Sequence, residues 1–375
     1  MKINRRSFLK RTLAAGSLAV GTGSLLSACS SSRRADLPDQ DLSKPINGQL
    51  DPNGGAILYH ASLAPSGHNA QPWFVRIVKK NEWIIGLDPQ RRLPEVDPDN
   101  REALLSIGAF AENLALAAGT YGFQAEMEII AENRFQQDII KVSLEPTRPS
   151  DYPLERLSGR MTVKQGYLAD EIKNEDIQAL SEPLKGRLFY FPKGTEHANC
   201  IEEGVIENFR IQAARDNAQQ ELVRWVRLSN KDAERYRDGL TVAGMEIHGF
   251  KGWFVRNFIN PEDFMKPSFR KQSIDMTAKL ARQGGGWLVI TSEGQTVTDL
   301  IDCGRRFERM ALMAKERNLA IQPMTQYLEE KEGQDQIAAD HTASIIPQFI
   351  LRAGYLKNYP NPASLRRPVN WFVRS

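Results

Sequence analysis

Apolar positions recur at helical spacing in two stretches that lie far apart in the chain. The first follows Asp99, and its apolar side chains are three or four residues apart, as on one face of a helix: Leu104, Ile107, Phe110, Ala111, Leu114 and Ala118. Asp99 precedes Glu102 by three residues, which predicts a capping box at the start of this helix. The second stretch, residues 298–317, predicts a helix of the same kind.

Short runs of β-branched and aromatic residues flank both helices. Residues 73–78 and 83–87 surround a brief polar stretch, which indicates a hairpin. Residues 123–130 follow the first helix, and the second helix stands between residues 287–291 and 319–324. We therefore expect two sets of strands, each with one long helix.

The two predicted helices share more than their amphipathic pattern. A constant offset of 196 residues aligns like with like, including a glycine, a glutamate and a residue suited to a left-handed helix end: Gly108 with Gly304, Glu112 with Glu308, Ala115 with Ala311, Leu116 with Leu312, Ala118 with Ala314 and Gly122 with Asn318. Amphipathicity alone explains the apolar matches. The shared polar and terminating residues favour an internal duplication.

A long polar segment, about residues 193–283, separates the two sets of elements and predicts further helices. It contains an aromatic stretch, Gly249, Phe250, Lys251, Gly252, Trp253 and Phe254, followed by Phe258 and Phe264. Such a stretch is compatible with core packing, with a lid over a ligand or with a membrane-facing patch.

The first residues of the chain have a different character. Arg5 and Arg6 open a basic segment without acids, a Gly- and Ala-rich apolar stretch follows, and residues 26–29 (Leu, Ser, Ala, Cys) complete it. The stretch is too short and too rich in glycine for a permanent membrane span. The pattern resembles a twin-arginine export signal over residues 1–29 ending in a lipobox, so we expect Cys29 to be acylated. The alternative is a basic amphipathic start that stays in the cytoplasm.

Removal of this signal changes the charge of the chain. The formal net charge of the full sequence is +3, and the signal accounts for five basic residues, which leaves −2 for the mature protein. No basic block interleaved with aromatic residues remains, so we expect no nucleic-acid partner. Residues 30–55 are rich in Ser, Asp, Pro and Gly, which predicts a tether between a membrane and the folded part.

Several kinds of site find no support in the sequence. The five histidines show no metal-ligand spacing, so we expect no metal. No nucleophile elbow, Walker loop or dinucleotide-binding glycine motif is present. After Cys29 the chain contains Cys200 and Cys303, whose wide spacing leaves open whether they are free thiols or a disulfide.

The most specific motif is the stretch Ala-Pro-Ser-Gly-His-Asn-Ala-Gln-Pro-Trp at residues 64–73. Its prolines, glycine and asparagine favour an open turn, and a predicted strand starts directly afterwards. Ser66, Asn69 and Gln71 offer uncharged donors and acceptors that suit a planar heterocycle. A purely structural turn with satisfied side chains is the alternative.

This stretch resembles the Pro-Ser-x-x-Asn-x-Gln-Pro-Trp loop of the nitroreductase superfamily. The resemblance implies FMN as cofactor and makes Ser66, Asn69 and Gln71 candidates for flavin contacts. It also implies a phosphate-binding element at Arg160, Thr162 and Lys164, where Lys164 lacks the bidentate fork of an arginine. Further positions that match the family's pattern are Gly285 within a glycine run, Gln322, and the basic pair Arg366 and Arg367.

From about Ala56 onwards the chain is similar to the branch in which two nitroreductase-like halves are fused. The resemblance implies a three-layer α+β fold built as a pseudo-dimer, with halves at residues 56–150 and 151–375 and a lid-like insertion at about 193–283. Because the Ser-Asn-Gln loop and the Arg-Thr-Lys element each occur once, we expect one FMN per chain between the halves.

The resemblance implies an oxidoreductase that passes two electrons through flavin N5 to a small aromatic, nitro or quinone-like acceptor stacked on the flavin. We name no catalytic acid or base. The alternatives are a flavin-binding or flavin-sequestering lipoprotein without turnover, and an interaction domain on an inactive scaffold.

The expected location bears on the electron donor. A twin-arginine signal implies contact with the twin-arginine export machinery, loading of FMN before export, and a protein held at the membrane on the periplasmic side by acylated Cys29. NAD(P)H is scarce there, so a membrane quinol or a protein is the expected reductant.

Overall fold

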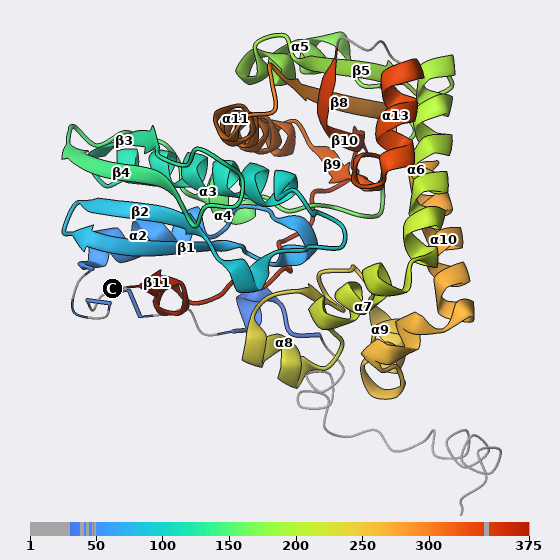
Figure 1. Ribbon diagram of the computed structural model, residues 1–375, viewed down its shortest axis with the longest axis horizontal. Helices are drawn as coiled ribbons and strands as arrows, with labels where there is room; N and C mark the ends of the chain where they lie inside the picture. The colour runs from blue at the N-terminus through green and yellow to red at the C-terminus, as the bar shows by residue number, and fades with distance from the viewer. Residues whose placement is uncertain are drawn as a thin grey trace, which may run out of the picture.

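The computed structural model describes residues 31–37, 41–42, 45–46, 48, 50–340 and 345–374. The export signal and Cys29 lie outside the described residues. The predicted α+β class is confirmed, because two mainly antiparallel sheets stand on either side of a pair of long helices (Figure 1).

The first sheet contains the predicted hairpin. β1 (Trp73–Lys79) and β2 (Glu82–Leu87) pair in antiparallel fashion, which confirms it. α3 (Arg101–Thr120) follows, and then β3 (Phe123–Ile129) and β4 (Asp138–Pro146). β4 lies between β2 and β3, so the order across the sheet is β1-β2-β4-β3.

The second sheet repeats this arrangement. β5 (Leu188–Pro192) pairs with β8 (Gly286–Ser292), then come α11 (Val297–Glu316), β9 (Leu319–Pro323) and β10 (Ile346–Tyr355). The order across the sheet is β5-β8-β10-β9, and all neighbours are antiparallel. In both sheets the helix connects the second strand to the third, and the fourth strand lies between them. An internal duplication would produce this shared order.

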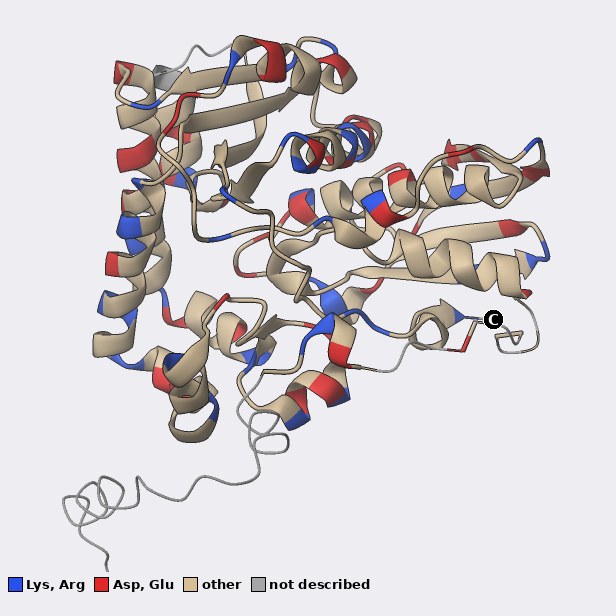
Figure 2. Cartoon of the chain, turned by 180° about the vertical axis from the view of Figure 1, so that it is seen from behind, with Lys and Arg blue, Asp and Glu red and all other residues tan. Residues whose placement is uncertain are grey.

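α3 and α11 cross at the two glycines that the offset of 196 residues aligns. A Cβ atom on Gly108 would lie 2.2 Å from the carbonyl oxygen of Ile301, and one on Gly304 would lie 2.1 Å from that of Leu105. The two backbones are therefore in direct contact, which no larger residue permits. Figure 2 shows that many positions of α11 are Lys, Arg, Asp or Glu, whereas most of the length of the strands is coloured as other residues.

The ends of the two helices agree only partly with the sequence. Gly122 (φ +79°) and Asn318 (φ +55°) both adopt the left-handed conformation, as predicted. The capping box expected at Asp99 is wrong. The carboxylate of Asp97 instead accepts hydrogen bonds from the amides of Glu102 (3.1 Å) and Ala103 (2.9 Å), because the left-handed Asn100 turns the chain before α3 begins.

In the second sheet, β5 and β8 correspond to β1 and β2 of the first sheet. A long helical insertion connects β5 to β8, whereas a tight turn connects β1 to β2. Its elements are α6 (Glu196–Ala214), α7 (Asp216–Trp225), β6 (Val226–Arg227), α8 (Asn230–Tyr236), β7 (Leu240–Thr241), α9 (Gly249–Phe258), η6 (Pro261–Met265) and α10 (Pro267–Ala281). α6 and α10 run along one side of the molecule, and α7, α8 and α9 lie at its lower end (Figure 1). Ile201 and Val205 of α6 pack with Trp287 and Val289 of β8, so the insertion has its own core against the second sheet.

The remaining elements are short: η2 (Arg34–Asp36), α2 (Pro52–Ala61), η3 (Gly67–Asn69), η4 (Pro89–Arg91), α4 (Glu155–Gly159), α5 (Asn174–Ser181), η5 (Glu182–Leu184), α12 (Gln326–Glu329), α13 (Lys331–Asp340), η7 (Val369–Trp371) and β11 (Val373–Arg374). β11 pairs in parallel with β1, so the C-terminal segment crosses from the second sheet to the edge of the first. It extends a sheet built from the other half of the sequence.

The segment expected to be a tether is partly folded. α2 begins at Pro52, Leu50 is buried, and the side chain of Arg34 donates hydrogen bonds to the carbonyls of Ser158 (3.2 Å) and Ser364 (3.0 Å). Composition alone suggested a solvated linker, but these contacts attach it to the folded part of the chain. Among the described residues, one helix, α3, is long and apolar enough to cross a membrane, and 78% of its most apolar stretch is buried within the protein.

Candidate functional site

The Ser-Asn-Gln loop has a strained backbone. His68, Asn69 and Gln71 have positive φ angles of 49°, 52° and 52°. A left-handed conformation is costly for residues other than glycine and persists only where the surroundings enforce it. The hydroxyl oxygen of Ser66 accepts a hydrogen bond from the amide of Gln71 (2.9 Å) and closes the loop on itself.

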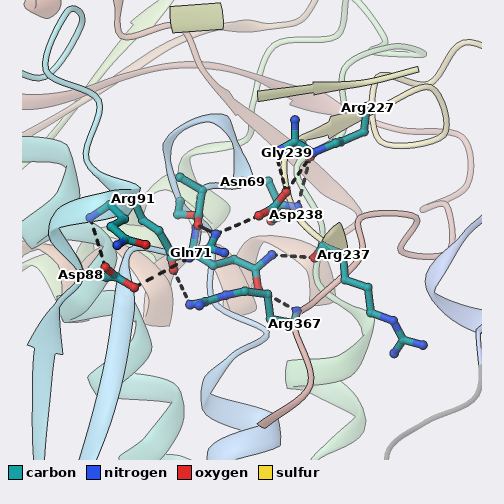
Figure 3. A network of polar contacts seen from close by, with 12 residues as sticks. Asn69, Gln71, Asp88, Arg91, Arg227, Arg237, Asp238, Gly239 and Arg367 are labelled. Atoms are coloured by element: carbon teal, nitrogen blue, oxygen red, sulfur yellow. Dashed lines mark hydrogen bonds and ion pairs between the residues drawn. The ribbon is translucent and has the colours of Figure 1, made fainter. Parts of the chain in front are cut away.

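The side chains of Asn69 and Gln71 hold this conformation (Figure 3). The Asn69 amide donates to the carbonyls of Gly239 and Leu365, both at 3.2 Å. Gln71, fully buried, donates to the carbonyl of Arg237 (2.9 Å). The insertion therefore lies against the loop through its 237–239 segment. Because these amides are bonded to protein, they hold the loop in place, and a flavin contact of their side chains stays a prediction.

The two arginines of the C-terminal pair have different environments. The amide of Arg367 donates to the side-chain oxygen of Gln71 (2.9 Å), and its guanidinium donates to the carbonyls of Gln71 (2.6 Å) and Trp73 (2.8 Å). Burial lowers the pKa of Arg367 to about 9. Arg367 thus ties the crossing C-terminal segment to the loop and to β1.

Arg366 faces Arg160 instead. Both guanidinium groups donate to the carbonyl of Leu63, Arg160 at 3.2 Å and Arg366 at 3.1 Å. Arg366 also donates to the side-chain oxygen of Asn69 (3.0 Å). Burial, with the nearby charges of Arg34 and Arg160, lowers the pKa of Arg366 well below its ordinary value. Two like charges therefore meet in the interior beside the loop.

One buried carboxylate stands opposite these cations. Glu308 of α11 lies 3.1 Å from the Nε atom of Arg160, and burial raises its pKa. The Nε atoms of Arg160 and Arg366 have no well-aligned hydrogen-bond acceptor among the described residues. Glu112, which the offset of 196 residues aligns with Glu308, is also buried and pairs with Arg305 of α11 at 3.0 Å. A buried cluster with more cations than anions and with unused N–H donors suits an anion.

Lys164, Gln322 and Gly285 belong to a second group around Arg352. The guanidinium of Arg352 donates to the carbonyl of Lys164 (2.7 Å) and to the side-chain oxygen of Gln322 (2.5 Å). The Lys164 ammonium donates to the carbonyl of Gly244 in the insertion, and burial lowers its pKa. A Cβ atom on Gly285 would lie 2.3 Å from the carbonyl oxygen of Asp170, so this position requires glycine.

Thr162 lies between the two groups in the sequence. Its side chain is partly buried and makes no hydrogen bond within the described part of the chain. The structure thus brings Ser66, Asn69, Gln71, Arg160, Arg366 and Arg367 together around the loop. It places Lys164, Gln322 and Gly285 around Arg352.

A group of buried carboxylates beside the loop escaped the sequence analysis. The Glu102 carboxylate would lie 3.2 Å from a Cβ atom on Gly67, and Glu329 of α12 faces it. Burial and the charge of Glu329 raise the pKa of Glu102 to about 7, and burial raises that of Asp97 to about 6. Glu102 sits in the first turn of an amphipathic helix, where a solvated glutamate is the usual interpretation. Only the fold of the loop reveals its burial.

Other titratable groups near the loop are neutral or unpaired. Burial lowers the pKa of His68 to about 4, and its Nδ1 atom has no hydrogen-bond partner among the described residues. Cys303, which is buried in α11, forms no disulfide with Cys200. Within the residues that the structure describes, no group of His, Cys, Asp and Glu has the arrangement of a metal site.

The chain is similar in sequence to proteins named as nitroreductases. A Serratia protein named as an NAD(P)H nitroreductase, PigM, is 23% identical over 318 residues, which cover 78% of this chain and 86% of that protein. A Mycobacterium tuberculosis protein also named as an NAD(P)H nitroreductase, Rv3131, is 24% identical over 332 residues, covering 84% and 90%. The chain has nitroreductase homologues along most of its length.

The similarity to family models and to solved structures is weak or absent. No protein-family model matches the chain. A solved nitroreductase structure with bound FMN, from Desulfitobacterium hafniense, aligns with 56% of this chain and 91% of its own at 11% identity and a TM-score of 0.30.

Arg34 is the other residue of the site that the sequence did not indicate. It lies in a Ser-rich segment whose composition predicts a linker, so nothing local marks it. Glu308 did have a signal, because it is a charged residue on the apolar side of a helix and is aligned with Glu112. Both residues acquire their place through contacts with residues far away in the sequence.

Proposed function

We propose that this chain is an FMN-dependent oxidoreductase of nitroreductase type, with one FMN between its halves. The proposal rests chiefly on the pair formed by the buried Arg160 and the partly buried Arg366, whose guanidinium groups share one carbonyl acceptor. Similarity to proteins named as nitroreductases along most of the chain supports the cofactor.

The anion that suits the arginine pair is the FMN phosphate. Its dianion would accept charge-assisted hydrogen bonds from Arg160 and Arg366, whose Nε atoms make no well-aligned hydrogen bond within the described residues. Binding of the phosphate would also oppose the two effects that lower the pKa of Arg366, which are burial and, second, repulsion by Arg34 and Arg160. Glu308 keeps part of the cation charge compensated when no phosphate is present.

The strained loop is proposed to lie along the flavin ring. The side chains of Asn69 and Gln71 are hydrogen-bonded to protein carbonyls and hold the loop backbone in place. We therefore expect Ser66 and His68 to be the side chains of the loop that contact a ligand. His68 is neutral at physiological pH, and the hydroxyl proton of Ser66 has no acceptor in the described residues. FMN, when bound, supplies two-electron transfer through its N5 atom to a small aromatic, nitro or quinone-like acceptor.

We also propose that the protein is exported by the twin-arginine pathway and anchored at the membrane by acylated Cys29. A membrane quinol or a protein would then supply the electrons, because NAD(P)H is scarce outside the inner membrane. Metabolic labelling with a fatty acid tests this directly. Label in the wild-type protein but not in Cys29→Ser is expected, and label in neither would contradict the anchor.

Variants of the arginine pair test the site. Arg160→Ala and Arg366→Ala should each lower the FMN content of the purified full chain, whereas Arg148→Ala, which removes an exposed arginine, should not. Near-ultraviolet circular dichroism shows whether each variant keeps its fold. Full FMN content in folded Arg160→Ala and Arg366→Ala would show that the phosphate lies elsewhere.

Turnover is tested on the holoprotein. Bound FMN is reduced anaerobically with a quinol, with a protein donor or with NADPH, and its reoxidation by a nitroaromatic compound or a quinone is followed. An enzyme reoxidises faster than free FMN does. Reoxidation at the rate of free FMN or below would instead identify a flavin-sequestering protein.

A further inference from the structure

Helix α9 in the insertion presents an unusual surface. Phe250 is 76% exposed, Phe254 44% and Phe258 53%, and Trp253 is partly exposed beside them. These four residues, here called the α9 aromatic face, recur three or four positions apart and so lie on one side of the helix. Their rings are in contact, with centroids 5.4 Å apart for Phe250 and Trp253 and 5.1 Å for Phe254 and Phe258.

The core-packing interpretation of this stretch is therefore wrong for most of its aromatic residues. The opposite side of α9 does pack inward, where Val255 and Ile259 contact a small apolar cluster around Val242, and Phe264 joins them. The helix is thus held firmly by one side while its other side exposes contiguous rings. A soluble monomer rarely leaves such a patch uncovered unless it binds something.

The charges around the patch indicate the kind of partner. Residues 249–258 contain Lys251 and Arg256 and no acid, and Lys251 is exposed. Aromatic rings on one side of a helix with basic residues beside them are typical of helices that lie in the interface of an anionic membrane.

The first described residues of the chain, Ser31 and Ser32, contact α9 and the neighbouring α8. The guanidinium of Arg256 donates a hydrogen bond to the hydroxyl of Ser31, and Ser32 bonds to Asn230 and Glu234 of α8. α8 and α9 lie at the same end of the molecule (Figure 1). Cys29 is two residues before Ser31 in the sequence, a span of at most about 7 Å. Acyl chains on Cys29 would therefore start beside the α9 aromatic face.

We propose that the α9 aromatic face docks on the surface of an anionic phospholipid bilayer and acts as a second membrane contact next to Cys29. The placement beside Cys29 rests on the proposed lipidation, whereas the exposed rings and basic residues do not. The apolar area that the rings bury would add to the membrane affinity that the acyl chains on Cys29 supply. Docking would also fix the orientation of the protein, so that the insertion faces the bilayer.

The test uses tryptophan fluorescence in the full chain carrying Cys29→Ser, which removes the lipid. Vesicles of phosphatidylethanolamine and phosphatidylglycerol with brominated acyl chains quench tryptophans that enter the interface. Trp253 and Trp371 are the tryptophans that are not buried, and Trp371 lies at the C-terminal end near the first sheet. Docking predicts quenching in Trp371→Phe, where Trp253 remains, and none in Trp253→Phe. Equal quenching, or none in either, would overturn the proposal.

A second pair of variants measures the contribution of the rings. Phe250→Ser should weaken vesicle binding roughly tenfold, about 1.4 kcal/mol, because the variant no longer buries an exposed aromatic ring in the apolar phase. Phe135→Ser provides the matched control, since Phe135 is 56% exposed on the loop between β3 and β4. Equal effects of the two substitutions would contradict docking through α9.

The possible results distinguish docking through α9 from lipid anchoring at Cys29 and from dimer formation. Quenching of Trp253 without acylation of Cys29 supports docking and refutes the lipid anchor. Acylation without quenching refutes docking alone. A concentration-dependent dimer that Phe250→Ser abolishes, with no vesicle binding, would assign the face to a second copy of the chain.

Discussion

The contact between α3 and α11 gives a sharp test of how the two halves meet. Gly108→Ala would place a methyl group 2.2 Å from the carbonyl oxygen of Ile301 and 3.0 Å from the Cα atom of Gly304. Ordinary contacts begin near 3.4 Å. The atoms that the methyl group would meet belong to the backbone of α11, so no side-chain rotation can relieve the clash. The two helices must therefore separate by about 1 Å.

The expected cost follows from two opposing effects. Overpacking of a well-packed interior typically destabilises by about 1 to 3 kcal/mol, and a backbone clash belongs at the upper end. Alanine is favoured over glycine within a helix by about 1 kcal/mol. We expect a net loss of about 2 kcal/mol in the free energy of unfolding, measured by urea denaturation. Gly304→Ala should behave alike, and the double variant should lose less than the sum.

Gly119→Ala is the matched control on the same helix. There the new methyl group would meet only the hydroxyl of Ser150 at 3.1 Å, which can rotate away. The helix preference of alanine should then stabilise the protein by up to about 1 kcal/mol. If Gly108→Ala proved as stable as Gly119→Ala, the helices would not cross at these glycines.

Three further predictions concern the loop and its surroundings. Arg366→Lys keeps the charge but loses the fork, so it should retain FMN better than Arg366→Ala and less well than the wild type, as flavin content will show. Because the folded-state pKa values of Glu102 (about 7) and Asp97 (about 6) are raised, the folded protein binds more protons than the unfolded chain, and stability should fall as pH rises from about 4 to 7. Glu102→Gln should flatten this decline by on the order of 2 kcal/mol; an unchanged slope in urea denaturation would contradict the assignment. Gln71→Ala should cost about 1 to 3 kcal/mol, since it leaves a buried donor and acceptor unpaired, and should speed hydrogen exchange in residues 237–246.

The parts of the fold that local pattern determines were predictable. The hairpin of β1 and β2, the helices α3 and α11 and their left-handed ends at Gly122 and Asn318 all follow from hydrophobic periodicity and terminating residues. The aligned glycines indicated a repeat, but only the structure shows that they are the point at which the helices touch.

The parts that depend on distant contacts were not predictable. Arg34 lies in a segment with the composition of a linker, yet it reaches Ser158 and Ser364 because the C-terminal segment returns to the first half. Arg366 and Arg367 are neighbours in sequence, and the extended backbone sends one toward Arg160 and the other toward Gln71. Residue type alone cannot distinguish their roles.

Flavin content of the purified full chain tests the central claim most directly. The visible absorption spectrum, with protein concentration measured independently, should show one FMN per chain, and FMN should be lost in parallel with the arginine pair in Arg160→Ala and Arg366→Ala. A colourless protein that takes up no FMN when the cofactor is added would contradict a flavin site between the halves.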